Sequence, residues 1–350
     1  MQLPLEAAQS ATDNHAGSVQ ATGQASEGHA AFHHIAACVD ASGFAQKVIP
    51  HALAIATALG SPVTFLRVVE AKPARIVPLD PVEWDIRLRE AQDEVAKLAE
   101  ERRLEAEHID TQVIEGEVAG RISHWAHDHG VELTVLGTHG DSGVTEWGLG
   151  STAQKLIDRV HGSLLLVPCN YATERTVHYH RLLVPLDGSP HAESVLPLAI
   201  RVALAARAEL LLVHVVPVPE LTEVGPLENE AVELRDQLIR RNERVAHEYL
   251  DRIRGRIGGD LSVRTRLVSA IDARSGLSRA ITEEAPDLIV LAAHGRSRRT
   301  DAAFGSLAAY LITHAVVPLL IVRRHPTHLA RHDAATAHQA PVRLPTHAES

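Results

Sequence analysis

The chain reads Gly137-Thr138-His139-Gly140 and, after nine further residues, Gly150-Ser151-Thr152. A second stretch nearly repeats it, because Ala292-Ala293-His294-Gly295 is followed after nine residues by Gly305-Ser306-Leu307. Both stretches lie directly after a short apolar run and before a segment with helical spacing. A glycine loop between a strand and a helix N-terminus lets backbone N–H groups face an anion. The sequence therefore predicts two phosphate-binding loops in two related domains.

Constant spacing elsewhere in the chain supports a duplicated domain. The offset from Asp40 to Asp187 is 147, and the same offset separates Val68 from Val215. The two loops are offset by 155, so eight extra residues lie between the second strand and the loop of the second copy. We predict two copies of about 140 residues each, an ordinary size for one domain.

The composition of the ends and of the middle suggests the domain limits. We expect the first domain over residues 31–169, a linker over 170–179 and the second domain over 180–324. Residues 1–30 and 325–350 lack helical or strand periodicity and predict two disordered tails. The second tail is rich in histidine, but irregular spacing and the absence of a cysteine favour a solvated tail over a metal site.

Charge and cysteine content exclude several classes of protein. The formal net charge is −10 and Lys and Arg form no dense block, which argues against a partner among nucleic acids. Two cysteines cannot form a disulfide framework, so we expect the reducing cytoplasm. No apolar run is long enough to span a membrane, and no basic segment followed by an apolar core marks a secretory signal.

Five strands alternate with four helices in each copy. The apolar runs are short and nearly continuous, as in parallel strands covered on both faces. We expect strands near 34–39, 62–69, 110–114, 132–136 and 163–167, and near 181–186, 209–216, 262–268, 287–291 and 318–322. We expect helices near 43–59, 82–104, 118–129 and 151–161, and near 190–206, 228–254, 273–284 and 306–314. This alternation predicts a doubly wound α/β fold with ligands at the carboxyl ends of the strands.

Polar and apolar residues recur at those strand ends. Asp40 and Asp187 each follow a first strand, where a carboxylate could accept a hydrogen bond from the amino group of a base. An aspartate there could equally be the N-cap of the next helix, and both interpretations stay open. Val68 and Val215 end the second strands and fit either an apolar wall against a flat ring or ordinary core.

The loops contain binding groups but no evident catalytic machinery. Gly137 and Gly140 permit a close approach of backbone to ligand. Ser151 and Ser306 could bind phosphate or act as helix N-caps, and His139 and His294 are interpreted as polar loop residues. The chain has no GxGxxG after its first strand, no GxxxxGK[ST] and no convincing Ser-His-Asp or Cys-His arrangement, so no catalytic residue is predicted.

The loops resemble the G-x2-G-x9-G-[S/T] signature of the universal stress protein family. The first copy matches all four positions, and the second matches three, with Ala292 in place of the first glycine. The first-strand aspartates Asp40 and Asp187 match the family as well, and the resemblance covers about residues 32–168 and 180–323.

This resemblance implies a fold and a ligand. The fold would be two tandem doubly wound five-stranded parallel sheets, Rossmann-like and adenine-nucleotide-binding, with strand order 3-2-1-4-5. ATP-binding members hold adenine near the first-strand aspartate and the second-strand valine, and the ribose and phosphates on the loop. Carried onto this chain, the binding residues are Val39, Asp40, Val68, Leu136, Gly137, His139, Gly140, Gly150, Ser151 and Thr152 in the first copy, and Leu186, Asp187, Val215, Leu291, Ala292, His294, Gly295, Arg296, Gly305, Ser306 and Leu307 in the second.

The resemblance further implies a cytoplasmic, ATP-binding sensor or regulator in the stress response. Its tandem domains would form the dimer that single-domain members make, and a homodimer of the whole chain stays open. One alternative is slow ATP hydrolysis, or nucleotidyl or phosphoryl transfer, on the same fold. Another is an interaction module with empty pockets. Whether the chain is an enzyme, and which protein lies downstream, are therefore left open.

The two loops differ in charge. Between the second and third signature glycines the first copy carries two carboxylates and the second carries three arginines and one aspartate, giving −2 against +2. A carboxylate repels a triphosphate unless Mg²⁺ lies between them, so we expect tighter ATP binding in the second pocket and a stronger Mg²⁺ requirement in the first. Ala292 would oppose this preference for the second pocket if its position requires positive φ, because alanine in that conformation costs about 1–2 kcal/mol.

Overall fold

The structure is a computed structural model of the 350-residue chain. It describes residues 32–40, 43, 45–70, 80–106, 108–138, 149–172, 174–219, 229–295, 303–314 and 316–323. The two tails expected at 1–30 and 325–350 lie outside these residues, as do His139, Gly140 and Arg296. Among the helices that are described, none has both the length and the apolar character needed to cross a membrane.

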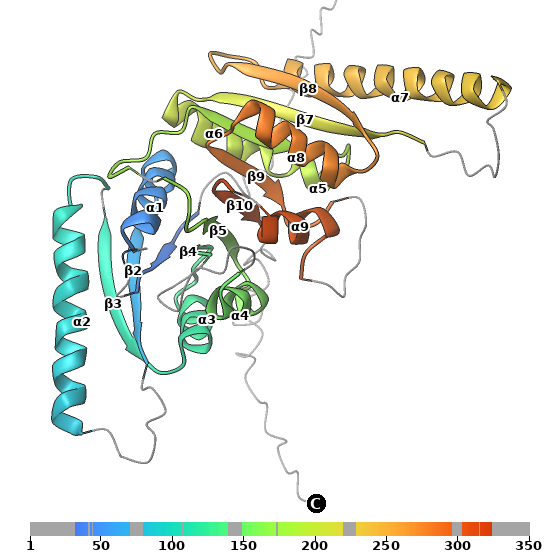
Figure 1. Ribbon diagram of the computed structural model, residues 1–350. Coiled ribbons are helices and arrows are strands. Elements are labelled where there is room, and N and C mark those ends of the chain that lie inside the picture. The colour runs from blue at the N-terminus through green and yellow to red at the C-terminus, as the bar shows by residue number, and fades with distance from the viewer. Residues whose placement is uncertain are drawn as a thin grey trace, which may run out of the picture.

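Each half of the chain alternates strands and helices (Figure 1). The first half contains β1 (Ile35–Cys38), α1 (Ala45–Leu59), β2 (Val63–Val69), α2 (Pro81–Glu101), β3 (Ile109–Glu115), α3 (Val118–Asp128), β4 (Leu133–Gly137), α4 (Ser151–Arg159) and β5 (Ser163–Val167). The second half contains β6 (Arg181–Pro185), α5 (Pro190–Glu193), α6 (Leu196–Ala206), β7 (Glu209–Pro217), α7 (Asn229–Arg256), β8 (Val263–Ala270), α8 (Ala273–Glu284), β9 (Leu288–Ala292), α9 (Ser306–His314) and β10 (Leu319–Val322).

The strand order confirms the predicted fold class. The sheet runs β3-β2-β1-β4-β5-β10-β9-β6-β7-β8, so each half has the order 3-2-1-4-5. Every strand pair within a half is parallel. In both halves the strand order reverses between the first and fourth strands, which is where ligands bind to open α/β sheets.

The two halves share one ten-stranded sheet, which the sequence analysis did not predict. Strands β5 and β10 pair antiparallel, with Leu164, Leu165 and Leu166 opposite Ile321, Leu320 and Leu319. Leu165 and Leu320 differ by the loop offset of 155, so equivalent residues face one another. The two copies are therefore related by a local pseudo-two-fold axis at this seam, as the tandem-as-dimer interpretation expects.

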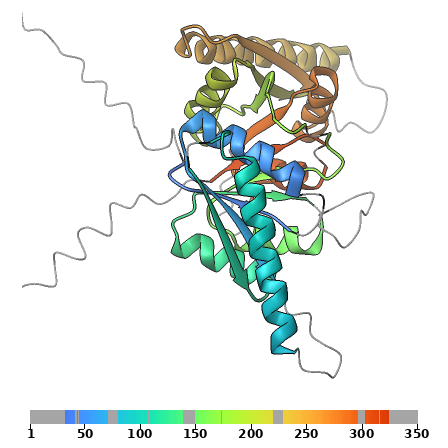
Figure 2. The ribbon, with the colours of Figure 1, turned by 90° about the vertical axis from the view of Figure 1, so that its left-hand side faces the viewer.

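Helices cover both faces of the sheet. One apolar cluster joins the strands to α1, α2, α5, α6 and α7, and a second joins them to α3, α4, α8 and α9. Helix α1 of the first half packs on α6 of the second half, and Figure 2 shows α1 and α2 in front of the strands on this face. The linker takes part in the packing, because Tyr179 is buried and its hydroxyl lies 3.0 Å from Nδ1 of His51 in α1.

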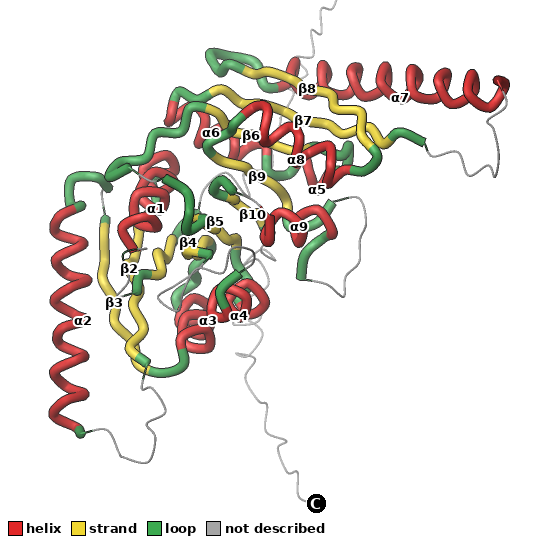
Figure 3. Tube along the Cα trace, viewed as in Figure 1, coloured by secondary structure: helices red, strands yellow, loops and turns green. Residues whose placement is uncertain are grey.

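One predicted helix is broken. The sequence suggested a single helix over 190–206, but the structure has the separate helices α5 and α6 (Figure 3). Pro197 lies in the first turn of α6, where a missing N–H is tolerated, and it cannot donate to the carbonyl of Glu193, so the hydrogen bond that would join α5 to α6 at this point is absent. Helix α5 follows β6 in the chain and contacts β9.

Candidate functional site

The first-strand aspartates occupy equivalent places in the two halves. The residue before each is fixed by a backbone hydrogen bond to the neighbouring strand, 2.9 Å from Val39 N to the carbonyl of Leu66 and 2.8 Å from Leu186 N to that of Val213. Asp40 is exposed and Asp187 is half-buried. Both therefore lie just beyond the carboxyl end of a central strand, as predicted.

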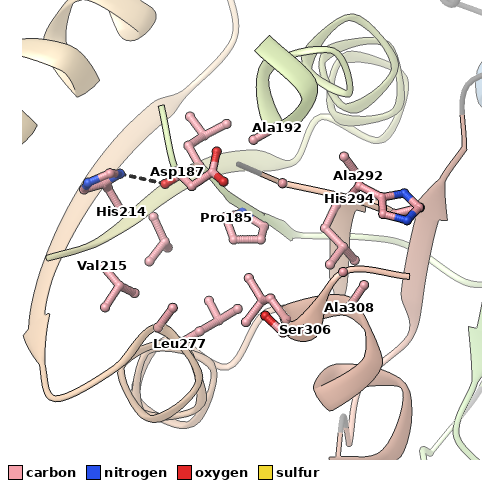
Figure 4. A pocket seen from close by; sticks show the side chains of 18 of the residues that line it. Pro185, Asp187, Ala192, His214, Val215, Leu277, Ala292, His294, Ser306 and Ala308 are labelled. Carbon is pink, nitrogen blue, oxygen red and sulfur yellow. Dashed lines mark hydrogen bonds between the residues drawn. The ribbon is translucent and has the colours of Figure 1, made fainter. Parts of the chain in front are cut away.

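A cavity of about 340 Å³ lies at the carboxyl ends of β6, β7 and β9 (Figure 4). This volume is within the usual range for small-molecule sites. It brings together every residue predicted for the second pocket except Arg296, which is not described: Leu186, Asp187, Val215, Leu291, Ala292, His294, Gly295, Gly305, Ser306 and Leu307. Sequence reasoning missed further lining residues, including Pro185, Ala192, His214, Ala273 and Leu277.

The carboxylate of Asp187 faces the loop rather than capping a helix. The N-cap of α5 is Ser189, whose Oγ accepts a hydrogen bond of 3.1 Å from Ala192 N. Asp187 Oδ1 accepts from Ser189 N at 2.9 Å, which orients the side chain. A Cβ added to Gly295 would lie 2.6 Å from Asp187 Oδ2. Gly295 is therefore needed for the space that the carboxylate occupies, and the N-cap interpretation is wrong for Asp187.

Apolar side chains form the wall next to this carboxylate. Val215 is half-buried, packs against α8 and also lines the cavity, so it is a core residue that presents apolar surface to the cavity. A Cβ added to Gly276 of α8 would lie 2.6 Å from Val215 Cγ1 and 2.9 Å from Ala270 Cβ. Gly276 thus allows α8 to approach β7 closely, and Leu277, the next residue, reaches the cavity (Figure 4).

His214 is a polar lining residue that the repeat could not reveal. The equivalent position of the first half is Arg67, which instead pairs with Glu94. The Nδ1 atom of His214 lies 2.7 Å from the carbonyl oxygen of Leu186, so this nitrogen carries the proton. The edge of the ring packs on Tyr249 of α7 at a centroid distance of 5.7 Å. The imidazole is therefore held in one orientation at the end of β7.

The second loop is closed by backbone hydrogen bonds. Gly305 N donates to the carbonyl of Ala293 at 2.8 Å, and Ala293 N donates to that of Val322 at 2.9 Å. The first helical bond of α9 runs from Ala309 N to the carbonyl of Gly305 at 2.9 Å. The N–H groups of Ser306, Leu307 and Ala308 have no acceptor within the helix, and all three residues line the cavity. This helix N-terminus can therefore receive an anion.

The first loop has the same closure where it is described. Gly150 N donates to the carbonyl of Thr138 at 2.8 Å, and Thr138 N donates to that of Val167 at 2.9 Å. Gly150 is the N-cap of α4, so Ser151 and Thr152 are its first two residues, and Ser151 is not a cap. Among the other predicted residues, Val39 and Leu136 are buried and Val68 and Gly137 half-buried at the ends of their strands.

Backbone conformation resolves the question about Ala292. It ends β9 and is not among the residues with positive φ, so the expected penalty for alanine does not arise there. The residue after Asp187, Gly188, does have a positive φ of 80°, which the sequence analysis did not predict. In the second half, the backbone conformation that favours glycine therefore occurs at Gly188, next to Asp187, and not at Ala292.

Among the cavity residues that the structure describes, Asp187 is the one with a carboxylate, and none is lysine or arginine; Arg296, Arg298 and Arg299 lie outside the described residues. In the first half, burial and the nearby Asp40 raise the pKa of the Cys38 thiol to about 12, which keeps it protonated at neutral pH. Within the described ranges, no group of three His, Cys, Asp or Glu residues could hold a metal ion.

Comparison with known proteins adds family information to this geometry. Residues 31–168 and 178–323 match the model of the universal stress protein family. A universal stress protein of Mycobacterium tuberculosis is 25% identical over 195 residues, which are 55% of this chain and 62% of that relative. The chain thus covers less than two thirds of that relative's length. Another from Methanocaldococcus jannaschii is 30% identical over 135 residues, 37% of this chain and 77% of the relative.

Solved structures show the same fold. A universal stress protein from Archaeoglobus fulgidus superimposes with a TM-score of 0.55 at 16% identity, covering 84% of this chain and 99% of that one. A functionally unknown protein from Pseudomonas aeruginosa superimposes with a TM-score of 0.60 at 15% identity, covering 88% of this chain and 98% of the other.

Proposed function

Because this chain belongs to the universal stress protein family, we propose that it binds ATP in the cavity of its second half and acts as a sensor or regulator in the stress response. The observation that carries the proposal is the arrangement of three groups around one cavity. A carboxylate, an apolar wall and a helix N-terminus meet there, contributed by Asp187, by Val215 with Leu277, and by Gly305 to Ala308 (Figure 4).

Each part of an adenine nucleotide has a complementary group in this cavity. Adenine is a flat ring with an exocyclic amino group, which suits an apolar wall beside a hydrogen-bond acceptor such as Asp187. The phosphates are anionic and suit the N-terminus of α9, on the other side of the cavity from Asp187. Ser306 is exposed at this N-terminus, so its hydroxyl can donate to a phosphate oxygen.

We propose the same ligand for the first half, where Asp40 and the N-terminus of α4 take the equivalent positions. There Mg²⁺ would offset the acidic side chains of the loop at 141–149. The domain limits of 31–169 and 180–324 and the cytoplasmic location remain predictions.

Identification of released nucleotide tests the proposal. The purified full-length protein is denatured, and the supernatant is analysed by chromatography and mass spectrometry. We expect ATP from the native sequence and from Asp40→Ala, with less from Asp187→Ala. Equal recovery from the variant carrying both substitutions would show that the nucleotide lies elsewhere. Phosphate release that is clearly above that of the doubly substituted protein would favour slow hydrolysis over binding alone.

A further inference from the structure

We propose that Arg323 positions the phosphate loop of the second half and couples it to helix α4 of the first half. Arg323 directly follows β10, the strand at the seam between the halves. The inference rests on the proposed function, because the loop that Arg323 holds is the one assigned to the phosphates of ATP.

One side of the Arg323 guanidinium caps a helix of the other half. It donates to the carbonyl of Val160 and, at 3.1 Å, to that of Ile157, at the C-terminal end of α4. The backbone N–H of Arg323 also donates to Oγ of Ser163, at 3.2 Å. The last carbonyl groups of a helix receive no hydrogen bond from within the helix, and they attract cations. Arg323 therefore binds the C-terminus of α4 from across the domain boundary.

The guanidinium also packs on the loop. Its Cζ atom lies 4.4 Å from the centroid of the Phe304 ring, a close cation–π contact. Phe304 immediately precedes Gly305, whose N–H closes the loop onto Ala293. Val322, the residue before Arg323, accepts the hydrogen bond from Ala293 N at 2.9 Å. Val322, the last residue of β10, and Arg323, which follows it, thus contact the two ends of the loop.

The contact joins the two candidate sites through one short helix. Helix α4 begins at Ser151, beside the first loop, and its C-terminal carbonyls bind Arg323. Its nine residues span about 13 Å, which is short enough to behave as a rigid element. A ligand that stabilises Phe304 and Gly305 in their present positions would therefore also stabilise the end of α4, and linkage requires that the effect be reciprocal.

The coupling is asymmetric between the two halves. By the offset of 155, the residue equivalent to Arg323 is Pro168 and the residue equivalent to Phe304 is Leu149. Proline has no guanidinium, so the first loop cannot be tied to α9 in the same way. The duplication has therefore placed the positioning side chain on the second half alone.

The test compares two arginines that cross the same domain boundary. Arg323→Met keeps a long side chain but removes the charge and the donors. The matched control is Arg201→Met, because Arg201 of α6 donates at 3.0 Å to the carbonyl of Leu59 at the end of α1, away from the cavity lining. Phe304→Leu is the second variant, since it keeps an apolar side chain and removes the ring face. All are made in the full chain carrying Asp40→Ala, so that ATP binding reports the second pocket.

Calorimetric titration with ATP should show an affinity about tenfold lower for Arg323→Met, a smaller loss for Phe304→Leu and no change for Arg201→Met. Hydrogen exchange supplies a readout that general destabilisation would not produce. Added ATP should slow exchange at the C-terminal end of α4 in the Asp40→Ala and Arg201→Met proteins but not in Arg323→Met.

Equal affinities for Arg323→Met and Arg201→Met, or an α4 response to ATP that survives in Arg323→Met, overturn the inference while leaving the proposed function intact. If Arg323→Met does not fold, Phe304→Leu decides, and an unchanged affinity and α4 response there overturn the inference. No ATP binding by the Asp40→Ala protein overturns the proposed function itself, and this inference with it.

Discussion

Replacement of Gly295 by alanine adds one methyl group to the second cavity and tests how the Asp187 carboxylate is placed there. The new Cβ would lie 2.6 Å from Asp187 Oδ2, so the carboxylate must retreat by roughly 0.8 Å to reach ordinary van der Waals contact. That movement disturbs the 2.9 Å hydrogen bond from Ser189 N and turns the carboxylate away from its present position. The fold itself should tolerate the change, because Gly295 does not have positive φ and the atom in the way ends a side chain.

The expected cost is the hydrogen bond between the carboxylate and the base. A hydrogen bond to a charged group contributes about 1.5–3 kcal/mol, so we expect ATP affinity in the second pocket to fall by at least about tenfold. Isothermal titration calorimetry of the Asp40→Ala protein with and without Gly295→Ala measures this. The thermal unfolding midpoint of each protein serves as the control for stability.

A double-mutant cycle shows whether the effect runs through Asp187. In the Asp187→Ala background there is no carboxylate for the new methyl group to displace, so Gly295→Ala should cause little further loss of affinity. If Gly295→Ala leaves the affinity of the native cavity unchanged, the assigned role of Asp187 is refuted. The same refutation follows if Gly295→Ala weakens binding equally with and without Asp187.

Three further outcomes are expected from the structure. The Arg264 guanidinium, together with Arg266, lowers the pKa of Glu284 from 4.5 to about 2. The ionised Glu284 therefore stabilises the folded state fully above pH 4.5, and this stabilisation is lost as the pH falls through about 2. Glu284→Gln should therefore lower the free energy of unfolding by about 3 kcal/mol at pH 7, measured in urea, with the difference vanishing near pH 2; a constant difference down to pH 2 contradicts this. Separate expression of residues 31–170 and 178–325 exposes β5 and β10 as sheet edges, so each half should self-associate in sedimentation, and two stable monomers at high concentration would be the opposite result. ATP binding by Asp187→Ala, which retains the first pocket, should weaken more on chelation of Mg²⁺ than binding by Asp40→Ala; stronger Mg²⁺-free binding by Asp187→Ala would reverse the proposed order.

The elements and their order could be predicted because the repeat appears twice. Asp40 and Asp187, and the two loops, have constant offsets that fix which segments are equivalent. Short apolar runs flanked by helices then leave few arrangements other than a doubly wound parallel sheet. The break before Pro197 could not be predicted from the proline alone, because Pro50 lies inside the continuous helix α1.

The seam between β5 and β10 could not be predicted in the same way. Leu164–Val167 and Leu319–Val322 have the same composition as any buried parallel strand. Nothing in a run of leucines and valines says whether its neighbour runs parallel or antiparallel, or belongs to the same domain. The antiparallel pairing follows only when the two copies are brought together around Leu165 and Leu320.

The site was partly hidden for a related reason. Asp187 and Gly305 have identical counterparts in the first copy, Asp40 and Gly150. The counterpart of His214 is an arginine, so comparison of the two copies gave no signal for His214. Gly276 has a role only because α8 packs within van der Waals distance of Val215. Ser189, rather than Asp187, caps the next helix, and sequence spacing alone could not separate these two acceptors.

The central claim is that ATP binds between Asp187 and the N-terminus of α9. The most direct measurement is a calorimetric titration of the full-length Asp40→Ala protein with ATP, repeated with Asp187→Ala added. We predict saturable binding of one ATP per chain in the first protein and an affinity lower by about tenfold or more in the second. Absence of saturable binding in the first protein, or equal affinity in the two, would contradict the claim.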